Sequence, residues 1–477
     1  MKIKIKNRIV VLLVSIFTLT LANAQVQTSD DNYRKPVIET IHKIETIFHV
    51  TINDKSGLLK GKELDYADWR IQQGNLEVSL ANVLAPFDLM YFMESDGTYT
   101  IRKFEYARMS VDKAKERLSF LSDSYTNLND WETRKKELKA CMRSSFGLDK
   151  APVMPKSKPI LTKKRIYKNY SVENIGIEIL PGVYATGSIY KPYPLKKKAA
   201  IIITPNGHFG DGRYRKDEQL RCAMLAQMGA IVVNFDLFAW GESTLQFPST
   251  FHRNSIASTI QVLSGIRLLD YVSTLKYSDV SRVGVTGGSG GGSHTMFLAA
   301  LDDRVTVSVP VVMVSSSFSG GCPCESGRGI HLCGNGTNNA EIAAMMAPKP
   351  QLIVSDGKDW TANVPELELP FIQRTYGFYG KKEMVQNAHF PKEGHDYGLS
   401  KRMAMYPFMA QYLGLNLDKV KNNEGEIDES TCVIEPKEKM YVFGDNGEKL
   451  PANALKDIDK LYELFGEKNK KEYHVEK

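Results

Sequence analysis

Short apolar runs alternate with helical stretches between positions 165 and 415, and this alternation limits the possible folds more than any other feature of the sequence. Runs that are apolar throughout and separated by helices are typical of parallel strands that helices cover on both faces. Two earlier runs, at 170–179 and 187–191, are predicted to pair antiparallel. The sequence therefore predicts an α/β class with a doubly wound, mostly parallel sheet, whose buried strands lie at 199–204, 230–235, 282–286, 305–309 and 351–354.

The segment Gly-Gly-Ser-Gly-Gly at 287–291 matches the pattern G-x-S-x-G and lies between the run ending at Thr286 and a helical stretch. A nucleophilic serine at the tip of a sharp turn requires this order of strand, turn and helix. The glycines leave room where side chains would collide with the strand and the helix. Ser289 is the predicted nucleophile, and the Gly290 amide would face the developing oxyanion. A phosphate-binding loop is the alternative, but Ser293-His294 stands where that loop requires Lys-Ser or Lys-Thr.

A serine hydroxyl needs a base that accepts its proton and an acid that orients this base. In folds with this turn the acid precedes the histidine, and both follow the serine. Asp359 comes just after the run 351–354, and His395 lies in a loop marked by proline and glycine, so we expect Asp359 to orient His395. Residues that could replace them are the acids Asp356, Glu366 and Glu368 and the base His389, whereas His294 is predicted to be structural.

A second oxyanion donor is expected in the loop Pro205-Asn206-Gly207-His208, which follows the run 199–204. A glycine there would let the backbone approach a substrate carbonyl closely. The donor is the backbone amide of His208 or of Phe209, and the sequence does not decide between them. The His208 side chain either lines the pocket or stabilises the loop.

The first 24 residues have the pattern of a secretory signal, with a basic start, an apolar stretch at 9–21 and Ala22-Asn23-Ala24 before Gln25. We predict cleavage after Ala24, and hence a periplasmic or secreted protein without a membrane span. A retained anchor is the alternative, but the apolar stretch is shorter than the roughly 18 residues that a span needs. The formal net charge of +7 falls to about +3 without this basic segment, which is little charge for a nucleic-acid-binding protein.

Six cysteines follow the predicted cleavage site, and export would allow disulfides among them. Cys322, Cys324 and Cys333 are close enough in sequence for a disulfide that joins Cys333 to either neighbour. Zinc binding by these cysteines together with His331 is the alternative. No second spaced pair of Cys or His completes a tetrahedral site in the sequence, so neither a metal nor a cofactor is expected.

The chain is predicted to comprise a signal peptide at 1–24, a small α+β domain at 25–105, a catalytic domain at 106–420 and a charged extension at 421–477. Two helices are expected within 106–148, and a strand at 440–443 and a helix at 455–465 within the extension. The stretch LEVSLANVLAPFDLMYFMESDGTYTIRK contains a predicted hairpin and resembles the short N-terminal domain of secretins and TonB-dependent receptors. This resemblance implies contact with an envelope protein, and a simple packing extension is the equal alternative.

Six motifs between Trp131 and Leu415 resemble those of the acetyl xylan esterase-like branch of the α/β-hydrolases: PNGHF, FDLFAWGES, SRVGVTGGSGGGSHT, GGCPCESG, EIAAMMAPKPQLIVSDGKDW and EGHDYG. The resemblance implies deacetylation, or another ester cleavage, on plant cell-wall carbohydrate without a cofactor. It places Ser289, Asp359 and His395 on the catalytic triad positions. The glycines on both sides of the serine and the three-cysteine loop depart from the family pattern, which leaves the pocket shape and the acylated carbohydrate substrate open.

Two other classes of function compete with the esterase. A peptidase of the prolyl oligopeptidase type has the same serine turn, but the region before the catalytic domain is too short for a β-propeller. A catalytically inert domain in an envelope binding or signalling protein is the other alternative. The complete set of nucleophile, base and acid favours an active hydrolase over both.

Overall fold

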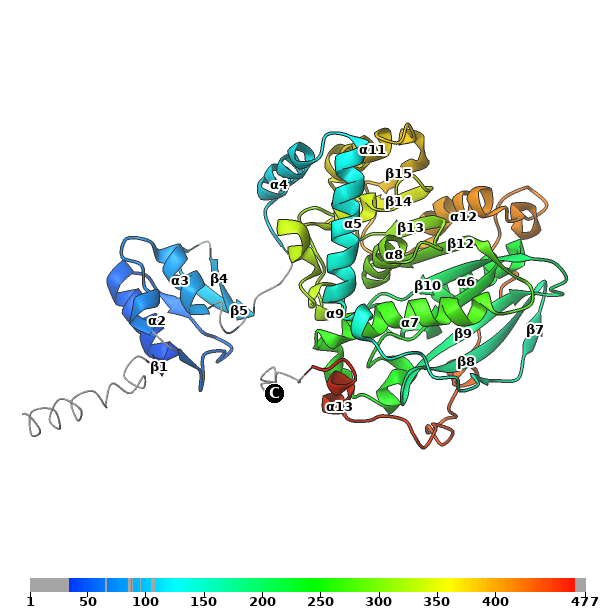
Figure 1. The fold of residues 1–477 in the computed structure, drawn as a ribbon, viewed down its shortest axis with the longest axis horizontal. Helices are drawn as coiled ribbons and strands as arrows, with labels where there is room; N and C mark the ends of the chain where they lie inside the picture. The colour runs from blue at the N-terminus through cyan, green and yellow to red at the C-terminus, as the bar shows by residue number, and fades with distance from the viewer. Residues whose placement is uncertain are drawn as a thin grey trace, which may run out of the picture. The chain divides into compact units, whose positions relative to one another are not determined.

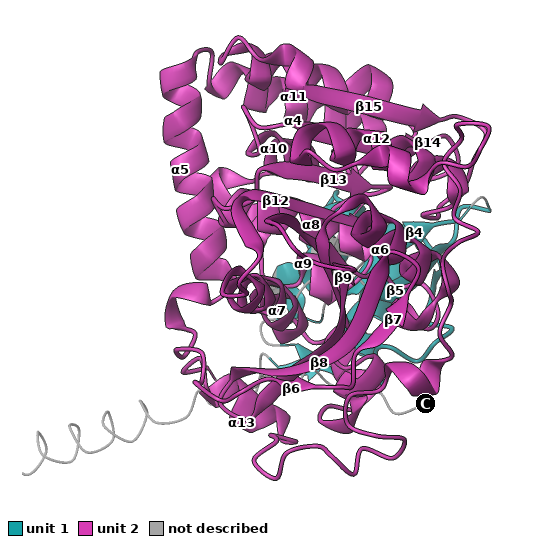
Figure 2. Ribbon diagram, turned by 90° about the vertical axis from the view of Figure 1, so that its right-hand side faces the viewer, with its two compact units in different colours: residues 1–105 teal, residues 106–477 magenta. Residues whose placement is uncertain are grey.

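The computed structural model describes residues 34–467 apart from 65, 66, 85, 86, 88, 95 and 104–107. The predicted signal peptide and its cleavage site therefore lie outside the described residues. The chain divides into two compact units, Met1–Glu105 and Tyr106–Lys477 (Figure 2). Residues 421–477 belong to the same unit as the three residues of the predicted triad. Among the described residues, no helix combines the length and the apolar character that crossing a bilayer requires.

The first unit is a small α+β module with its own apolar core (Figure 1). Val37, Ile41 and Ile44 recur at helical spacing, and all three are buried against the second helix. The predicted hairpin is confirmed, because β4 and β5 pair antiparallel, and β2 pairs with β5 in parallel. The elements are β1 (Lys35–Pro36), α2 (Val37–Phe48), β2 (Ile52–Asn53), β3 (Glu63–Leu64), η2 (Ala67–Arg70), α3 (Leu76–Leu84), β4 (Leu89–Met93) and β5 (Tyr99–Lys103).

The second unit is built on one ten-stranded sheet with the order β15-β14-β13-β12-β10-β11-β9-β8-β6, in which β7 also pairs with β8. Strands β10 to β15 pair with one another in parallel. Every pairing that involves a strand from β6 to β9 is antiparallel. The predicted doubly wound, mostly parallel sheet with an antiparallel start is thus confirmed. The strands are β6 (Ile160–Leu161), β7 (Arg165–Tyr167), β8 (Tyr170–Leu180), β9 (Val183–Pro192), β10 (Ala199–Pro205), β11 (Ile231–Phe235), β12 (Ser278–Gly288), β13 (Val307–Val311), β14 (Gln351–Asp356) and β15 (Val385–Phe390).

Side chains of the central strands alternate between two apolar cores, one on each face of the sheet. In β10, Ile201 and Ile203 belong to one core and Ile202 belongs to the other. Helices α7 (Ile256–Ser273) and α8 (Gly290–Leu301) contribute to the first core, together with α10 (Asn339–Ala344) and α11 (Leu369–Gly377). Helices α6 (Lys216–Met228) and α12 (Leu399–Leu413) contribute to the second. Burial on both faces explains why the strand runs are apolar throughout.

The two helices predicted before the sheet are α4 (Val111–Ser124) and α5 (Leu128–Ser145). Each begins at a polar side chain that accepts backbone N–H groups of the first turn, Ser110 for α4 and Asn127 for α5. In α5, Trp131, Leu138 and Met142 fall on one face and are fully buried in the first core. The helix therefore packs on the second unit as part of it.

A disulfide joins Cys141 on α5 to Cys333 in η8 (Ile330–Asn335), with a Cα–Cα distance of 5.7 Å and a sequence separation of 192 residues. The predicted disulfide between Cys333 and Cys322 or Cys324 is therefore wrong. His331, which the alternative of a zinc site had named as a ligand, lies with its Nε2 atom 2.9 Å from Asn339 Oδ1. Spacing along the chain suggested a local pair, whereas the fold supplies the partner from a distant helix.

The charged C-terminal extension packs on the antiparallel part of the sheet, and its predicted strand at 440–443 is wrong. A 3-10 turn, η12 (Lys437–Met440), precedes Val442 and Phe443, whose backbone N–H groups donate to the buried carboxylate of Glu242. The same carboxylate accepts a hydrogen bond from Arg213, which is almost fully buried. The predicted helix at 455–465 is present in shorter form as α13 (Ile458–Glu463).

Candidate active site

Ser289 lies at the corner between β12 and α8, with φ 56° and ψ −124°. A positive φ is rare for a residue with a side chain and costs about 1–3 kcal/mol, so the surrounding structure must hold it in place. The backbone N–H of Ser289 donates to Val311 O on the neighbouring strand β13. This is the sharp strand-to-helix turn that the G-x-S-x-G pattern predicts.

The glycines around Ser289 are required because the backbones of three segments meet there. A Cβ atom on Gly287 would lie 2.4 Å from Pro205 O, and one on Gly291 would lie 2.3 Å from the same oxygen. A Cβ atom on Gly290 would lie 2.8 Å from Cε1 of His208. Contacts this short require the backbone to shift, so side chains at these positions would displace the turn from the loop that follows β10.

The structure brings together the three side chains that the sequence singles out. Nε2 of His395 lies 2.8 Å from Ser289 Oγ, and Nδ1 of His395 lies 2.6 Å from Asp359 Oδ2. Asp359 follows β14 and His395 follows β15, so both residues stand at the carboxyl edge of the parallel sheet, where Ser289 also lies. A carboxylate that accepts a hydrogen bond from the Nδ1–H group keeps the proton on Nδ1, so that the Nε2 lone pair can accept a hydrogen bond from the serine hydroxyl.

The site holds Asp359 in its anionic form. Its side chain is 3 % exposed, and burial by itself would raise the pKa of this carboxyl group. Hydrogen bonds from His395 and Thr361 outweigh burial, so the pKa of Asp359 is lowered. Thr361 supplies two of these bonds, because both its backbone N–H and its hydroxyl lie 2.6 Å from Oδ1. One carboxylate oxygen is thus occupied by Thr361 and the other faces His395.

The competing acids are placed away from His395. Asp356, at the end of β14, lies 3.4 Å from Lys401 Nζ. Burial and the negative charge of Asp359 raise the pKa of Asp356 to about 6. The two neighbouring carboxyl groups therefore differ, because the pKa of Asp356 is raised and that of Asp359 is lowered. Glu368 accepts hydrogen bonds from the backbone and hydroxyl of Ser316. Glu366 lies in η9 (Val364–Glu368), the turn that leads into α11.

The competing histidines also have other partners. His389 lies in β15, and its Nδ1 atom is 2.8 Å from Ser355 Oγ. His294 is buried in α8, with its Nε2 atom 2.6 Å from Nε2 of Gln261. Burial lowers the pKa of His294 to about 3, which keeps it neutral. The buried position of His294 fits the structural role that we expected for it.

The loop after β10 lies directly against the serine turn, where a Cβ atom on Gly207 would be 2.4 Å from Gly288 O. Gly290 is the first residue of α8, and the first N–H groups of a helix have no acceptor within it. The Gly290 amide and the amide of His208 or Phe209 stay the predicted oxyanion donors. The His208 side chain is held by His252 and Cys324, which lie 2.8 and 3.1 Å from its Nε2 atom. Its side chain therefore belongs to the loop's support rather than to the substrate pocket.

Two aromatic rings lie beside the imidazole of His395. The ring centroids of Trp360 and Phe209 lie 4.3 and 5.5 Å from that of His395, and Phe318 lies 4.3 Å from Trp360. The guanidinium of Arg108 lies 4.8 Å from the centre of the Phe318 ring. Phe318 is buried, whereas Trp360 and Phe209 are half-buried and provide flat apolar surface for a ligand beside His395.

Comparison with known proteins identifies the family. Methylesterase BT1017 has 46% sequence identity to this chain and a TM-score of 0.76, and the match covers 92% of this chain and 98% of that one. The chain belongs to the family of this methylesterase. This membership makes it a carboxylic ester hydrolase and confirms the esterase resemblance seen in the sequence.

Weaker structural similarity extends to other esterases. An acetyl xylan esterase from Paenibacillus sp. R4 has 19% identity and a TM-score of 0.43, covering 62% of this chain and 99% of that one. A glucuronoyl esterase from Solibacter usitatus has 15% identity and a TM-score of 0.41, covering 60% and 93%. The family assignment depends on the methylesterase and not on these two. No family model matches the chain, and no curated protein matches it either.

Proposed function

We propose that this chain is a serine carboxylesterase that removes methyl groups from esterified carboxylates of a plant cell-wall carbohydrate. The observation that carries the proposal is the 2.8 Å contact between Ser289 Oγ and His395 Nε2 at a strained strand-to-helix turn, with Asp359 on the other side of the imidazole. The choice of a methyl ester follows the methylesterase that shares 46% of its residues with this chain.

In the proposed reaction, Ser289 Oγ attacks the ester carbonyl while His395 Nε2 takes its proton. The charge on the carbonyl oxygen is stabilised by the Gly290 amide and by an amide of the 205–209 loop. The tetrahedral intermediate then loses methanol, which receives the proton from His395. Water, deprotonated by His395, hydrolyses the acyl-enzyme, so that a free carboxylate leaves and Ser289 regains its proton. Asp359 stabilises the imidazolium in both halves of the cycle.

The two ester types differ in which fragment stays on the enzyme. With a methyl ester of a sugar acid, the carbohydrate is the acyl group, so it remains bound to Ser289 while methanol leaves. With an acetyl ester, the sugar leaves first and the serine carries an acetyl group. The aromatic surface of Trp360 and Phe209 beside His395 suits a ring that must stay in place until water attacks.

A screen on methyl-esterified and on acetylated polysaccharides tests the proposal when methanol and acetate are measured separately. We expect methanol from the methyl-esterified substrates and loss of its release in Ser289→Ala, with the fold of this variant intact. Acetate as the main product would instead support the acetyl esterase. Cleavage of a proline-containing peptide would favour the peptidase. Failure of a fluorophosphonate to label Ser289 would favour the inert binding protein.

We also propose that the protein is exported and acts in the periplasm or outside the cell. The basic and apolar pattern of residues 1–24 predicts a signal peptide, and the Cys141–Cys333 disulfide fits an oxidising compartment. The N-terminal unit has its own core, which fits a separate module for contact with an envelope protein. Determining the mature N-terminus of the exported protein tests the cleavage after Ala24.

A further inference from the structure

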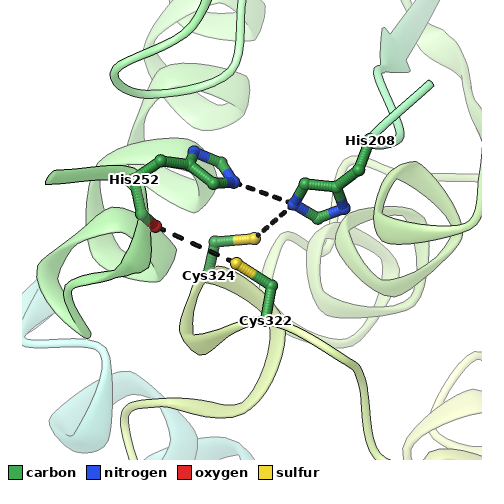
Figure 3. A group of neighbouring side chains, drawn as sticks. All are labelled: His208, His252, Cys322 and Cys324. Atoms are coloured by element: carbon green, nitrogen blue, oxygen red, sulfur yellow. Dashed lines mark hydrogen bonds between the residues drawn. The ribbon is translucent and has the colours of Figure 1, made fainter. Parts of the chain in front are cut away.

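Four potential metal ligands meet in a cluster behind the serine turn: His208, His252, Cys322 and Cys324 (Figure 3). Their ligand atoms all lie within 4.8 Å of one another, and all but His208 are buried. The residues come from three segments that are distant in sequence. His208 lies in the loop after β10, His252 in η7 (Ser249–Arg253), and the cysteines at the start of α9 (Pro323–Ser326).

The spacing of the ligand atoms is close to that of a tetrahedral zinc site. With Zn–N near 2.0 Å and Zn–S near 2.3 Å, neighbouring ligand atoms of a tetrahedron lie about 3.3 to 3.8 Å apart. In the cluster, His208 Nε2 lies 2.8 Å from His252 Nε2 and 3.1 Å from Cys324 Sγ. Small side-chain movements would therefore admit an ion at the centre.

The hydrogen bond on the outer side of the His252 ring also suits a metal ligand. Its Nδ1 atom lies 2.6 Å from the backbone oxygen of Phe238, and a carbonyl oxygen can only accept, so Nδ1 carries the proton. A neutral ring then directs the Nε2 lone pair into the cluster. Histidines that bind metals have this second hydrogen bond, which fixes the tautomer and the orientation of the ring.

A carboxylate, that of Glu325, also lies on the outer side of the His208 ring. A Cβ atom on Gly290 would lie 2.9 Å from His208 Nδ1 and 3.1 Å from Glu325 Oε1. The Glu325 carboxylate and the outer nitrogen of His208 are therefore both close to Gly290. Glu325 is 3 % exposed. A carboxylate beside the outer nitrogen of a ligating histidine is the usual support of such a ligand.

We infer that these four residues bind one zinc ion as a closed, structural site that supports the oxyanion loop. Two thiolates and two imidazoles favour zinc over magnesium or calcium, and two thiolates neutralise the charge of the ion in a buried place. With all four positions taken by protein, the ion has no position for substrate. It would instead hold His208, in the loop behind Ser289, to the segments of η7 and α9.

This inference departs from the sequence-based expectation of no metal, and it also revises the choice of ligands. Cys333 and His331 have other partners, whereas His252 was not considered. The sequence does contain a signal for this site: His208 and His252 follow β10 and β11. These strands are parallel neighbours, so the segments after them begin at the same edge of the sheet. The Cys-x-Cys spacing at 322–324 supplied the other half.

Metal analysis of the untagged, full-length protein after dialysis against metal-free buffer tests the inference. We expect one zinc ion per chain, and X-ray absorption with two sulfur and two nitrogen neighbours. Cys324→Ser and His252→Ala should reduce zinc at least tenfold. Cys432→Ser, which changes a partly buried thiol outside the cluster, should leave it unchanged.

Wild-type protein with less than a tenth of an equivalent of zinc would overturn the inference. So would a disulfide between Cys322 and Cys324 in the mass spectrum, or oxygen ligands in the absorption data. These measurements use the wild type, so they stand even where a cysteine variant fails to fold. Ser289→Ala should keep its zinc, so the failure of the esterase proposal and the failure of the metal site are distinguishable.

Discussion

Asp359→Asn should abolish most of the ester hydrolysis while leaving the fold in place, and the structure explains why. The Oδ1 atom of Asp359 accepts two hydrogen bonds from Thr361, one from the backbone N–H. In the variant, that N–H must still find an oxygen, so the amide oxygen takes the Oδ1 position and the NH₂ group faces His395. His395 Nδ1 would then have to accept, which places the imidazole proton on Nε2. An imidazole protonated at Nε2 cannot take the proton of Ser289.

The expected loss in kcat is about 10⁴-fold, the size found when a triad aspartate is replaced by asparagine and the histidine takes the wrong tautomer. This corresponds to about 5 kcal/mol of transition-state free energy. The structure supports a loss of this full size, because Asp359 is 3 % exposed and its pKa is lowered, so an anion at 2.6 Å from His395 is removed where water cannot replace it.

Steady-state release of nitrophenol from an aryl acetate measures the effect, with circular dichroism and thermal melting as the check on folding. Asp356→Asn is the matched control, since this neighbouring carboxyl group pairs with Lys401 and not with His395. We expect the control to keep kcat within tenfold of the wild type. An Asp359→Asn variant that keeps more than a tenth of wild-type kcat would refute the orientation argument, as would an equal loss in both variants.

Three further predictions follow from other contacts. Replacing Cys141 and Cys333 together by serine opens a loop of 192 residues and should cost about 5 kcal/mol of stability on the chain-entropy relation, or about 7 °C in Tm by calorimetry without reductant; an unchanged Tm contradicts this. Gly290→Ala places a Cβ atom 2.8 Å from the His208 ring and should lower kcat about 10²-fold by displacing an oxyanion donor, and near-normal kcat would show that the turn can relax. The pKa of Asp356 is raised to about 6, so the protonated group contributes stability that is present below about pH 4 and is lost as the pH rises through 6. The Tm of Asp356→Asn relative to wild type should therefore rise between about pH 4 and 7, and a constant difference contradicts this.

The fold and the positions of the triad could be predicted because their signals are local. Apolar runs buried on both faces identify parallel strands wherever they occur, and the glycines around Ser289 mark a turn whose geometry depends on its immediate neighbours. The order of acid and histidine then selects Asp359 and His395, because each follows a strand whose carboxyl end meets the same edge.

Features that depend on distant partners could not be predicted in this way. The disulfide partner of Cys333 lies 192 residues away, and nothing near either cysteine indicates it. The apolar residues 440–443 have strand propensity, yet Val442 and Phe443 donate their N–H groups to a carboxylate and not to a neighbouring strand. Tertiary contacts override local preference in both cases.

The hydrogen bonds from Val442 and Phe443 to Glu242 show that the domain predicted at 106–420 extends into the charged segment 421–477. A chain shortened to residue 420 would keep every residue of the triad, but Glu242 would lose these two donors and the apolar contact of Val442 and Phe443 with Tyr184 would be lost. Glu242 lies in η6 (Gly241–Leu245), which leads into the segment that carries His252. A variant truncated after position 420 should therefore lose ester hydrolysis because the segment from η6 to His252 misfolds. This loss is expected although every residue of the triad precedes position 420.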